Sequence, residues 1–194
     1  MTSPLEDRLH IKVSELRQVS DFINSSEFLS AISTITSFIN NSFELSSSLY
    51  FAGNGGSYAE ALHISAEFSG RFKQDRSPLS AYTLGSNQSS LTAIANDYTY
   101  QKIFSREIAA FCRADDTVIL LSTSGHSPNI VDALSACELL DCQTILLTSE
   151  NCHLSLKQRD NLYVFKVPFS STDTIQEVHL IMLHLVCSAF EPSA

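Results

Sequence analysis

The chain has 194 residues, of which 44% are hydrophobic and 17% are charged, and its net charge at pH 7 is −9. This is the composition of a folded protein with a sizeable core, and the length favours a single domain over residues 1–194. The acidic balance argues against nucleic acid as the main partner, because binding a phosphate backbone needs clustered lysine and arginine.

The cysteines and the apolar runs bear on where the protein works. There are five cysteines, an odd number, and no C-x-x-C pair occurs. Reduced, buried thiols are the expected state, which fits a cytoplasmic protein. The N-terminus lacks the basic and apolar regions of a signal peptide, and no apolar run is long enough to span a bilayer. We therefore expect no membrane partner.

The N-terminal part of the chain, residues 1–43, is predicted to be helical. Apolar residues recur at helical spacing over residues 4–43, in two segments separated by the polar break Asn24-Ser25-Ser26. From residue 47 to residue 194, strand and helix patterns alternate. Strands are expected at 48–52, 79–84, 117–122, 143–148 and 162–167. Helices are expected at 57–70, 88–95, 100–113, 128–141, 152–159 and 173–190.

The alternation after residue 47 predicts an α/β fold. We expect a three-layer α/β/α sandwich with a five-stranded parallel sheet, preceded by the N-terminal helices. In such sheets ligands bind beyond the carboxyl ends of the strands. The segments that follow the strands are therefore the first place to look for chemistry.

The first of these segments is Gly53-Asn54-Gly55-Gly56-Ser57, which we call the glycine turn. It connects a strand to a helix, and its glycines allow close approach of the backbone to a ligand. Exposed N–H groups and the helix dipole make such a turn suitable for an anion. The sequence matches neither the dinucleotide nor the ATP fingerprint. A plain strand-to-helix turn is the alternative.

The second segment is Ser122-Thr123-Ser124-Gly125-His126-Ser127-Pro128-Asn129, and we call its residues 122–127 the hydroxyl turn. It gathers four hydroxyl groups at the start of a predicted helix, and each can donate a hydrogen bond to a phosphate oxygen. A serine-rich helix cap is the alternative. The density of hydroxyl groups favours phosphate binding.

Two helices carry candidate acid, base or metal-binding groups. His63 and Glu67 are four residues apart and share one helix face. Gln176 and His184 are eight residues apart, which places them within about 80° of each other around their helix. Each helix alone is also compatible with a structural role. Taken together, two His, one Glu and one Gln form a set that can bind zinc.

These segments, read in order, resemble the sugar isomerase (SIS) domain of the phosphoheptose isomerase family. The resemblance also includes Leu91-Thr92-Ala93-Ile94-Ala95-Asn96-Asp97 and Phe104-Ser105-Arg106, and it extends over nearly the whole chain. It implies conversion of sedoheptulose 7-phosphate to D-glycero-D-manno-heptose 7-phosphate, the first step toward the heptose of lipopolysaccharide or surface polysaccharide. It also implies a homotetramer with active sites between subunits.

The resemblance assigns roles residue by residue. Glu67 and His184 would be the catalytic acid/base pair, which suits an aldose–ketose isomerisation through an enediol(ate). One zinc per subunit would be bound by His63, Glu67, Gln176 and His184, in a catalytic or a structural role. The substrate contacts would be Asn54, Gly55, Gly56, Ser57, Glu67, Asn96, Asp97, Ser122, Thr123, Ser124, Ser127 and Gln176.

The chain departs from the family pattern at two places that matter below. Residues 149–153 contain no glycine, whereas the family has a glycine-rich loop there, and position 126 is His where Asn or Lys is usual. The second function considered is a non-catalytic SIS-domain regulator of the DnaA initiator-associating type. Glu67 and His184 favour the enzyme, because the regulator class lacks both groups.

Overall fold

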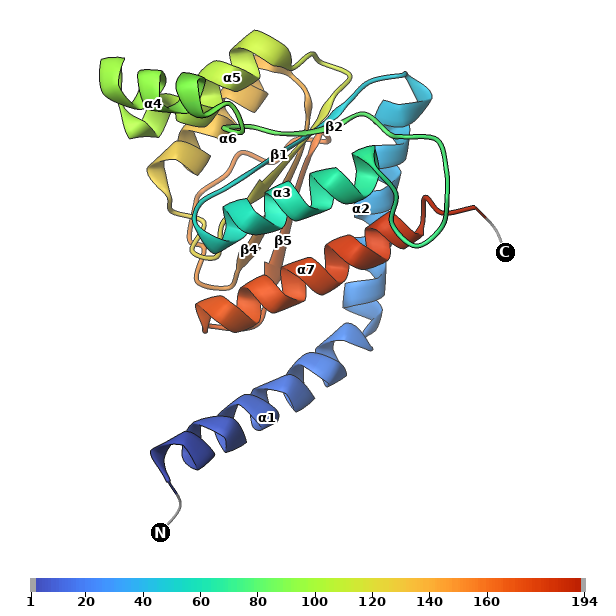
Figure 1. Ribbon diagram of the computed structural model, residues 1–194, viewed down its shortest axis with the longest axis vertical. Helices are drawn as coiled ribbons and strands as arrows, with labels where there is room; N and C mark the ends of the chain where they lie inside the picture. The colour runs from blue at the N-terminus through green and yellow to red at the C-terminus, as the bar shows by residue number, and fades with distance from the viewer. Residues whose placement is uncertain (1–2, 193–194) are drawn as a thin grey trace.

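A computed structural model describes residues 3–192 and shows a parallel sheet between two layers of helices (Figure 1). The strands are β1 (Leu49–Gly53), β2 (Ala81–Thr83), β3 (Thr117–Leu121), β4 (Gln143–Ser149) and β5 (Leu162–Val167). Their order across the sheet is β2-β1-β3-β4-β5, and each neighbouring pair is parallel. The expected three-layer sandwich with a five-stranded parallel sheet is confirmed.

The helices divide between the two faces of the sheet. They are α1 (Pro4–Ile23), α2 (Ser26–Glu44), α3 (Gly56–Ser69), α4 (Gln88–Asp97), α5 (Ile103–Phe111), α6 (Pro128–Leu140) and α7 (Thr172–Ser188), with a 3-10 turn at Tyr100–Lys102. One hydrophobic core joins α2, α3 and α7 to one face of the sheet, and a second core joins α5 and α6 to the other. Figure 1 shows α4, α5 and α6 together on the side opposite α7.

The N-terminal helices form as the sequence predicts. Ser3 and Glu6 make a capping box at the start of α1, and Ser25 caps α2. Helix α1 projects from the body of the molecule in Figure 1 and buries only Val19. Its Lys12 ammonium lies 2.7 Å from Asp173 and 2.8 Å from Glu177, so α1 is tied to the beginning of α7.

The expected helix at 152–159 is wrong, because this segment has no regular secondary structure. Leu154 and Leu156 pack against the second core while His153, Ser155 and Lys157 are exposed. Exposure that alternates with period two is the geometry of an extended chain, so a helix could not have buried both leucines on one face. The expected helix at 100–113 is also shorter, since it begins with the 3-10 turn and ends at Phe111.

The cysteines are free and buried, as expected. Among the described residues, no helix combines the length and the apolar character needed to cross a membrane.

Candidate functional site

The glycine turn connects β1 to α3 in a conformation that needs glycine. Gly55 precedes the helix with φ of 55°, a left-handed value that other residues adopt at a cost. A Cβ on Gly53 would lie 2.6 Å from the carbonyl carbon of Ser57, so a side chain at position 53 would collide with backbone. The strand–turn–helix context predicted for this segment is confirmed.

The glycine turn is joined directly to the segment that follows β3. Gly53 and Leu121 are paired across the sheet, so the two strands end at the same level. The side-chain amides of Asn54 and Asn129 exchange two hydrogen bonds of 2.8 Å, and the Tyr100 hydroxyl donates to Asn54 Oδ1 at 2.9 Å. Neither Asn129 nor Tyr100 was a candidate from the sequence, because both act through a contact with a distant segment.

The hydroxyl turn lies between β3 and α6, with its oxygens accepting hydrogen bonds from its own backbone. The N–H of Gly125 donates to Ser122 Oγ at 3.1 Å, and the N–H of His126 donates to Ser124 Oγ at 3.2 Å. Ser127 is the N-cap residue of α6, yet its side chain makes no capping hydrogen bond. The simple capping alternative therefore does not account for Ser127.

The histidines of α3 and α7 meet between the two helices. The Nε2 atoms of His63 and His184 are 2.8 Å apart, and the Glu67 carboxylate is 3.7 Å from His63 Nδ1. The His184 ring stacks on Phe72 with 5.5 Å between centroids. Burial lowers the pKa of His184, and a positive charge on nearby His63 would lower it further. The structure thus places His63 between Glu67 and His184, the two residues expected to be the acid/base pair.

Gln176 contacts a different part of α3. Its Nε2 donates to Ser57 Oγ at 3.4 Å, and its amide group lies against the backbone of Gly56. Eight residues of helix place His184 about 12 Å further along α7. Gln176 therefore lies beside the glycine turn, and His184 lies near the middle of α3.

Glu60 is a buried acidic residue that the sequence reasoning missed. It lies one helical turn before His63, is 8% exposed, and neither carboxylate oxygen has a hydrogen-bond partner among the described residues. Burial raises its pKa to about 7, an effect that the neighbouring Ser57 hydroxyl partly offsets. The spacing Glu60, His63, Glu67 on one helix face was the available signal.

Asn96 and Asp97 lie at the end of α4 and contact each other, with Asn96 Nδ2 donating to Asp97 Oδ1 at 2.8 Å. Both side chains are exposed. Within residues 3–192, no hydrogen bond joins them to the other candidate residues, so their role in binding stays a prediction.

Three of the four proposed zinc ligands, His63, Glu67 and His184, fit the metal in kind, since zinc binds His nitrogen and carboxylate oxygen, and Gln176 would add an amide oxygen. His63 and His184 converge, whereas Glu67 lies on the far side of the His63 ring and Gln176 lies beside Ser57. In the described part of the chain, no group of three or more His, Cys, Asp or Glu side chains is arranged to hold a metal ion.

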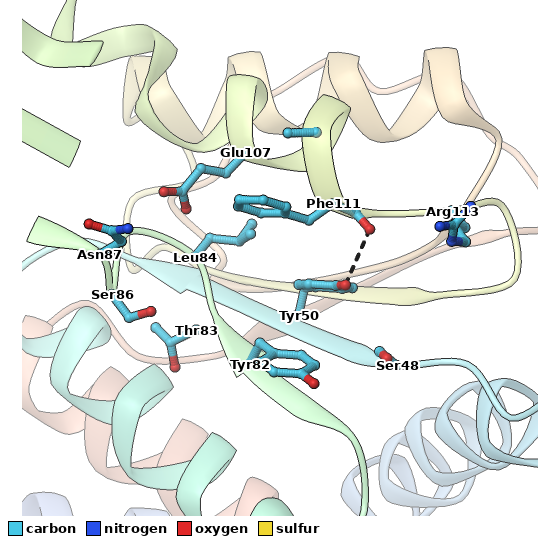
Figure 2. A pocket seen from close by; sticks show the side chains of 11 residues that line it. Ser48, Tyr50, Tyr82, Thr83, Leu84, Ser86, Asn87, Glu107, Phe111 and Arg113 are labelled. Atoms are coloured by element: carbon cyan, nitrogen blue, oxygen red, sulfur yellow. Dashed lines mark hydrogen bonds between the residues drawn. The ribbon is translucent and has the colours of Figure 1, made fainter. Parts of the chain in front are cut away.

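A cavity of about 490 Å³ lies away from these residues, along β2 and α5. Figure 2 shows Tyr50, Tyr82 and Phe111 around it, with the Tyr50 hydroxyl donating to the Phe111 carbonyl, and Arg113 at one end. None of the candidate residues lines this cavity. The candidate site is instead the place where the segments following β1 and β3 meet, at the carboxyl ends of these strands.

Comparison with known proteins agrees with this geometry. A family model described as SIS domain matches residues 15–149. A probable phosphoheptose isomerase from Thermoplasma acidophilum is 35% identical over 184 residues, which cover 95% of this chain and 91% of the relative. A phosphoheptose isomerase from Citrifermentans bemidjiense is 39% identical over 165 residues, 85% of each chain. The solved structure of a phosphoheptose isomerase from Neisseria gonorrhoeae has a TM-score of 0.87 at 28% identity, with 96% of this chain and 99% of that chain covered. The chain therefore belongs to the phosphoheptose isomerase family of SIS-domain proteins.

Proposed function

We propose that this protein converts sedoheptulose 7-phosphate to D-glycero-D-manno-heptose 7-phosphate through an enediol(ate), in heptose biosynthesis for lipopolysaccharide or surface polysaccharide. The observation that carries the proposal is the pairing of His184 with the His63–Glu67 face of α3, on the same side of the sheet as the glycine turn that begins that helix. Membership of the phosphoheptose isomerase family supports it. The non-catalytic regulator is not favoured, because the chain has both Glu67 and His184.

The two turns would bind opposite ends of the substrate. We assign the phosphate to Ser122, Thr123, Ser124 and Ser127, whose hydroxyl groups lie at the N-terminus of α6. The sugar end would contact Asn54, Gly55, Gly56, Ser57 and Gln176. The position of Gln176 against Gly56 and Ser57 supports this assignment. Asn96 and Asp97 would add contacts from α4.

The isomerisation moves a proton between two carbons and another between two oxygens. The Glu67 carboxylate would take the carbon-bound proton and return it to the neighbouring carbon. His184 would exchange the oxygen-bound proton, because its lowered pKa keeps the ring neutral, with one nitrogen able to accept a proton and the other able to donate one. The contacts of His184 with His63 and Phe72 hold its ring in one orientation.

We also propose one zinc ion per subunit, bound by His63, Glu67, Gln176 and His184. The donor types and the convergence of the two histidines support it. Zinc at this position would polarise the substrate carbonyl or stabilise the enediolate.

We propose a homotetramer with active sites between subunits. The exposed apolar side chains of α1 support an interface, since Leu5 is 75% exposed, Leu9 58% and Leu16 47%. The free cysteines support a cytoplasmic location.

The test is turnover of sedoheptulose 7-phosphate by the full chain, with detection of the aldose product. The assay is run on protein as purified, after chelation, and after addition of zinc, with metal content and molecular mass measured on the same samples. Aldose formation is expected. Its absence under all three conditions would favour the regulator and refute the enzymatic proposal.

A further inference from the structure

The loop after β4, residues 149–153, lies directly against the hydroxyl turn. Ser149 Oγ donates a hydrogen bond of 2.7 Å to the Thr123 carbonyl. Gly125, with φ of 72°, lies so close to the loop that a Cβ there would be 2.2 Å from Cys152 Sγ. Cys152 is itself fixed, because its carbonyl accepts a hydrogen bond of 2.6 Å from Lys166 Nζ on β5. The loop therefore contacts the turn directly and is itself connected to β5.

His126 is the side chain that reaches from the hydroxyl turn to this loop. Its Nε2 is 3.2 Å from the Asn151 carbonyl oxygen and 3.4 Å from the His153 backbone nitrogen. A protonated Nε2 donates to the carbonyl, and an unprotonated Nε2 accepts from the N–H group. The His126 ring therefore has a hydrogen-bond partner on the loop whether or not Nε2 carries a proton.

The contact with loop 149–153 matters because the hydroxyl turn carries hydrogen-bond donors that can face a ligand. The Ser122 and Ser124 oxygens accept hydrogen bonds from the Gly125 and His126 N–H groups. The Ser124 hydroxyl proton is therefore left to donate to a ligand, while the Ser122 hydroxyl donates to Ser127 Oγ at 3.5 Å. Within the described chain, the backbone N–H groups of Thr123, Ser124 and Ser127 have no hydrogen-bond acceptor. Their direction depends on the backbone of residues 123–127, which the loop holds.

We propose that His126 is a positioning residue for the substrate phosphate: by tying the hydroxyl turn to loop 149–153, it keeps the phosphate donors in their binding arrangement. This inference rests on the proposed assignment of the phosphate to the hydroxyl turn. It also gives a role to the two places where the chain departs from its family, since His126 and the glycine-free loop contact each other. Preorganised donors bind more tightly because less ordering accompanies binding.

The test measures KM and kcat for sedoheptulose 7-phosphate, and the inhibition constant of inorganic phosphate, in three variants. His126→Ala should raise KM and the phosphate inhibition constant by about three- to tenfold, the loss expected for about one net hydrogen bond, with kcat changed by less than about twofold. His126→Asn, which keeps a donor and an acceptor, should recover most of the loss. Gln158→Ala, an exposed change in the same connection between β4 and β5, should match wild type.

A structural role alone predicts a different result. If His126→Ala lowers the melting temperature while phosphate inhibition stays at the wild-type value, the proposal is overturned. Should that variant fold poorly, Ser149→Ala removes a separate link between the same two segments and should raise KM in the same direction. An unchanged KM in Ser149→Ala would also contradict the proposal that loop 149–153 holds the hydroxyl turn in its binding arrangement.

Ser127→Ala distinguishes this inference from the assignment on which it rests. If Ser127→Ala weakens phosphate inhibition and His126→Ala does not, the positioning role is wrong and the phosphate site stands. If Ser127→Ala also leaves phosphate inhibition unchanged, the phosphate assignment fails, and the role of His126 is overturned with it.

Discussion

The substitution Gly56→Ala separates activity from stability at the candidate site. A Cβ at position 56 would lie 2.4 Å from Gln176 Nε2, 2.8 Å from its Oε1 and 2.9 Å from its Cδ. These atoms belong to the end of a flexible side chain, so the Gln176 amide moves and the backbone of α3 stays in place. The substitution therefore displaces one predicted substrate contact without a change in the fold.

The effect on stability should be small because its contributions oppose one another. Loss of the 3.4 Å hydrogen bond between Gln176 and Ser57 costs about 0.5–1 kcal/mol, and a strained glutamine rotamer costs a similar amount. Alanine is favoured over glycine within a helix by up to about 1 kcal/mol, and position 56 is the first residue of α3. The free energy of unfolding should change by less than about 1 kcal/mol.

The effect on activity should be large if Gln176 contacts the substrate. Displacement of a positioning group by about 1 Å costs up to about 10²-fold in rate, so kcat/KM should fall by between about 10- and 10²-fold. Urea unfolding and the aldose assay measure the two quantities on the same preparation. The matched variants are Gln176→Ala and the double substitution. If Gly56→Ala acts by moving Gln176, the double variant should be no worse than Gln176→Ala. Wild-type kcat/KM in Gly56→Ala would refute the reasoning, and additive losses in the double variant would show that the methyl group acts at the proposed Gly56 contact itself and not through Gln176.

Three further predictions follow from other parts of the structure. Glu67→Gln should lower turnover by at least about 10²-fold with unchanged melting temperature and oligomer mass, and full activity would exclude Glu67 as the base. His179 is buried, and burial lowers its pKa to about 4, so the unfolded chain binds a proton that the folded chain rejects as pH falls below about 6.5. Urea unfolding should show a loss of about 2 kcal/mol between pH 7.5 and pH 5 that is absent in His179→Gln, and parallel curves for the two proteins would contradict this. Gly125→Ala should destabilise by about 2 kcal/mol or more, because it combines a left-handed φ with a collision against Cys152 Sγ; a smaller loss in urea unfolding would mean that loop 149–153 yields easily.

The sequence predicted β3 correctly because the burial of this strand is uniform along its length. Every residue of β3 is buried, as a central strand covered by helices on both faces should be, and the continuous apolar run Val118–Leu121 predicted it. The helix predicted at 152–159 was wrong although the segment carries a local pattern. Leu154 and Leu156 are partly buried against the second core and alternate with exposed residues, and this period of two favours an extended chain over a helix.

Those parts of the candidate site that follow from the succession of strand, turn and helix along the chain were predictable from the sequence. Each turn follows a parallel strand and begins a helix, and that context alone located residues 53–57 and 122–127. The link between Asn54 and Asn129 was not predictable, because it joins segments 75 residues apart. Helical periodicity gave the direction of Gln176 and His184 around α7 but no partner for either, and only the structure shows that one contacts Ser57 and the other His63.

The strand order explains why the proposed acid/base residues and the proposed phosphate-binding residues belong to different helices. β1 and β3 are neighbours in the sheet, but α3 follows β1 onto one face and α6 follows β3 onto the other. A crevice opens where adjacent strands lead to helices on opposite faces, and ligands bind there in open parallel sheets. α7 packs beside α3, and this packing brings His63 and His184 together on that face. The opposite face offers the N-terminus of α6, which suits an anion. A substrate with a carbonyl at one end and a phosphate at the other therefore matches the two sides of this crevice.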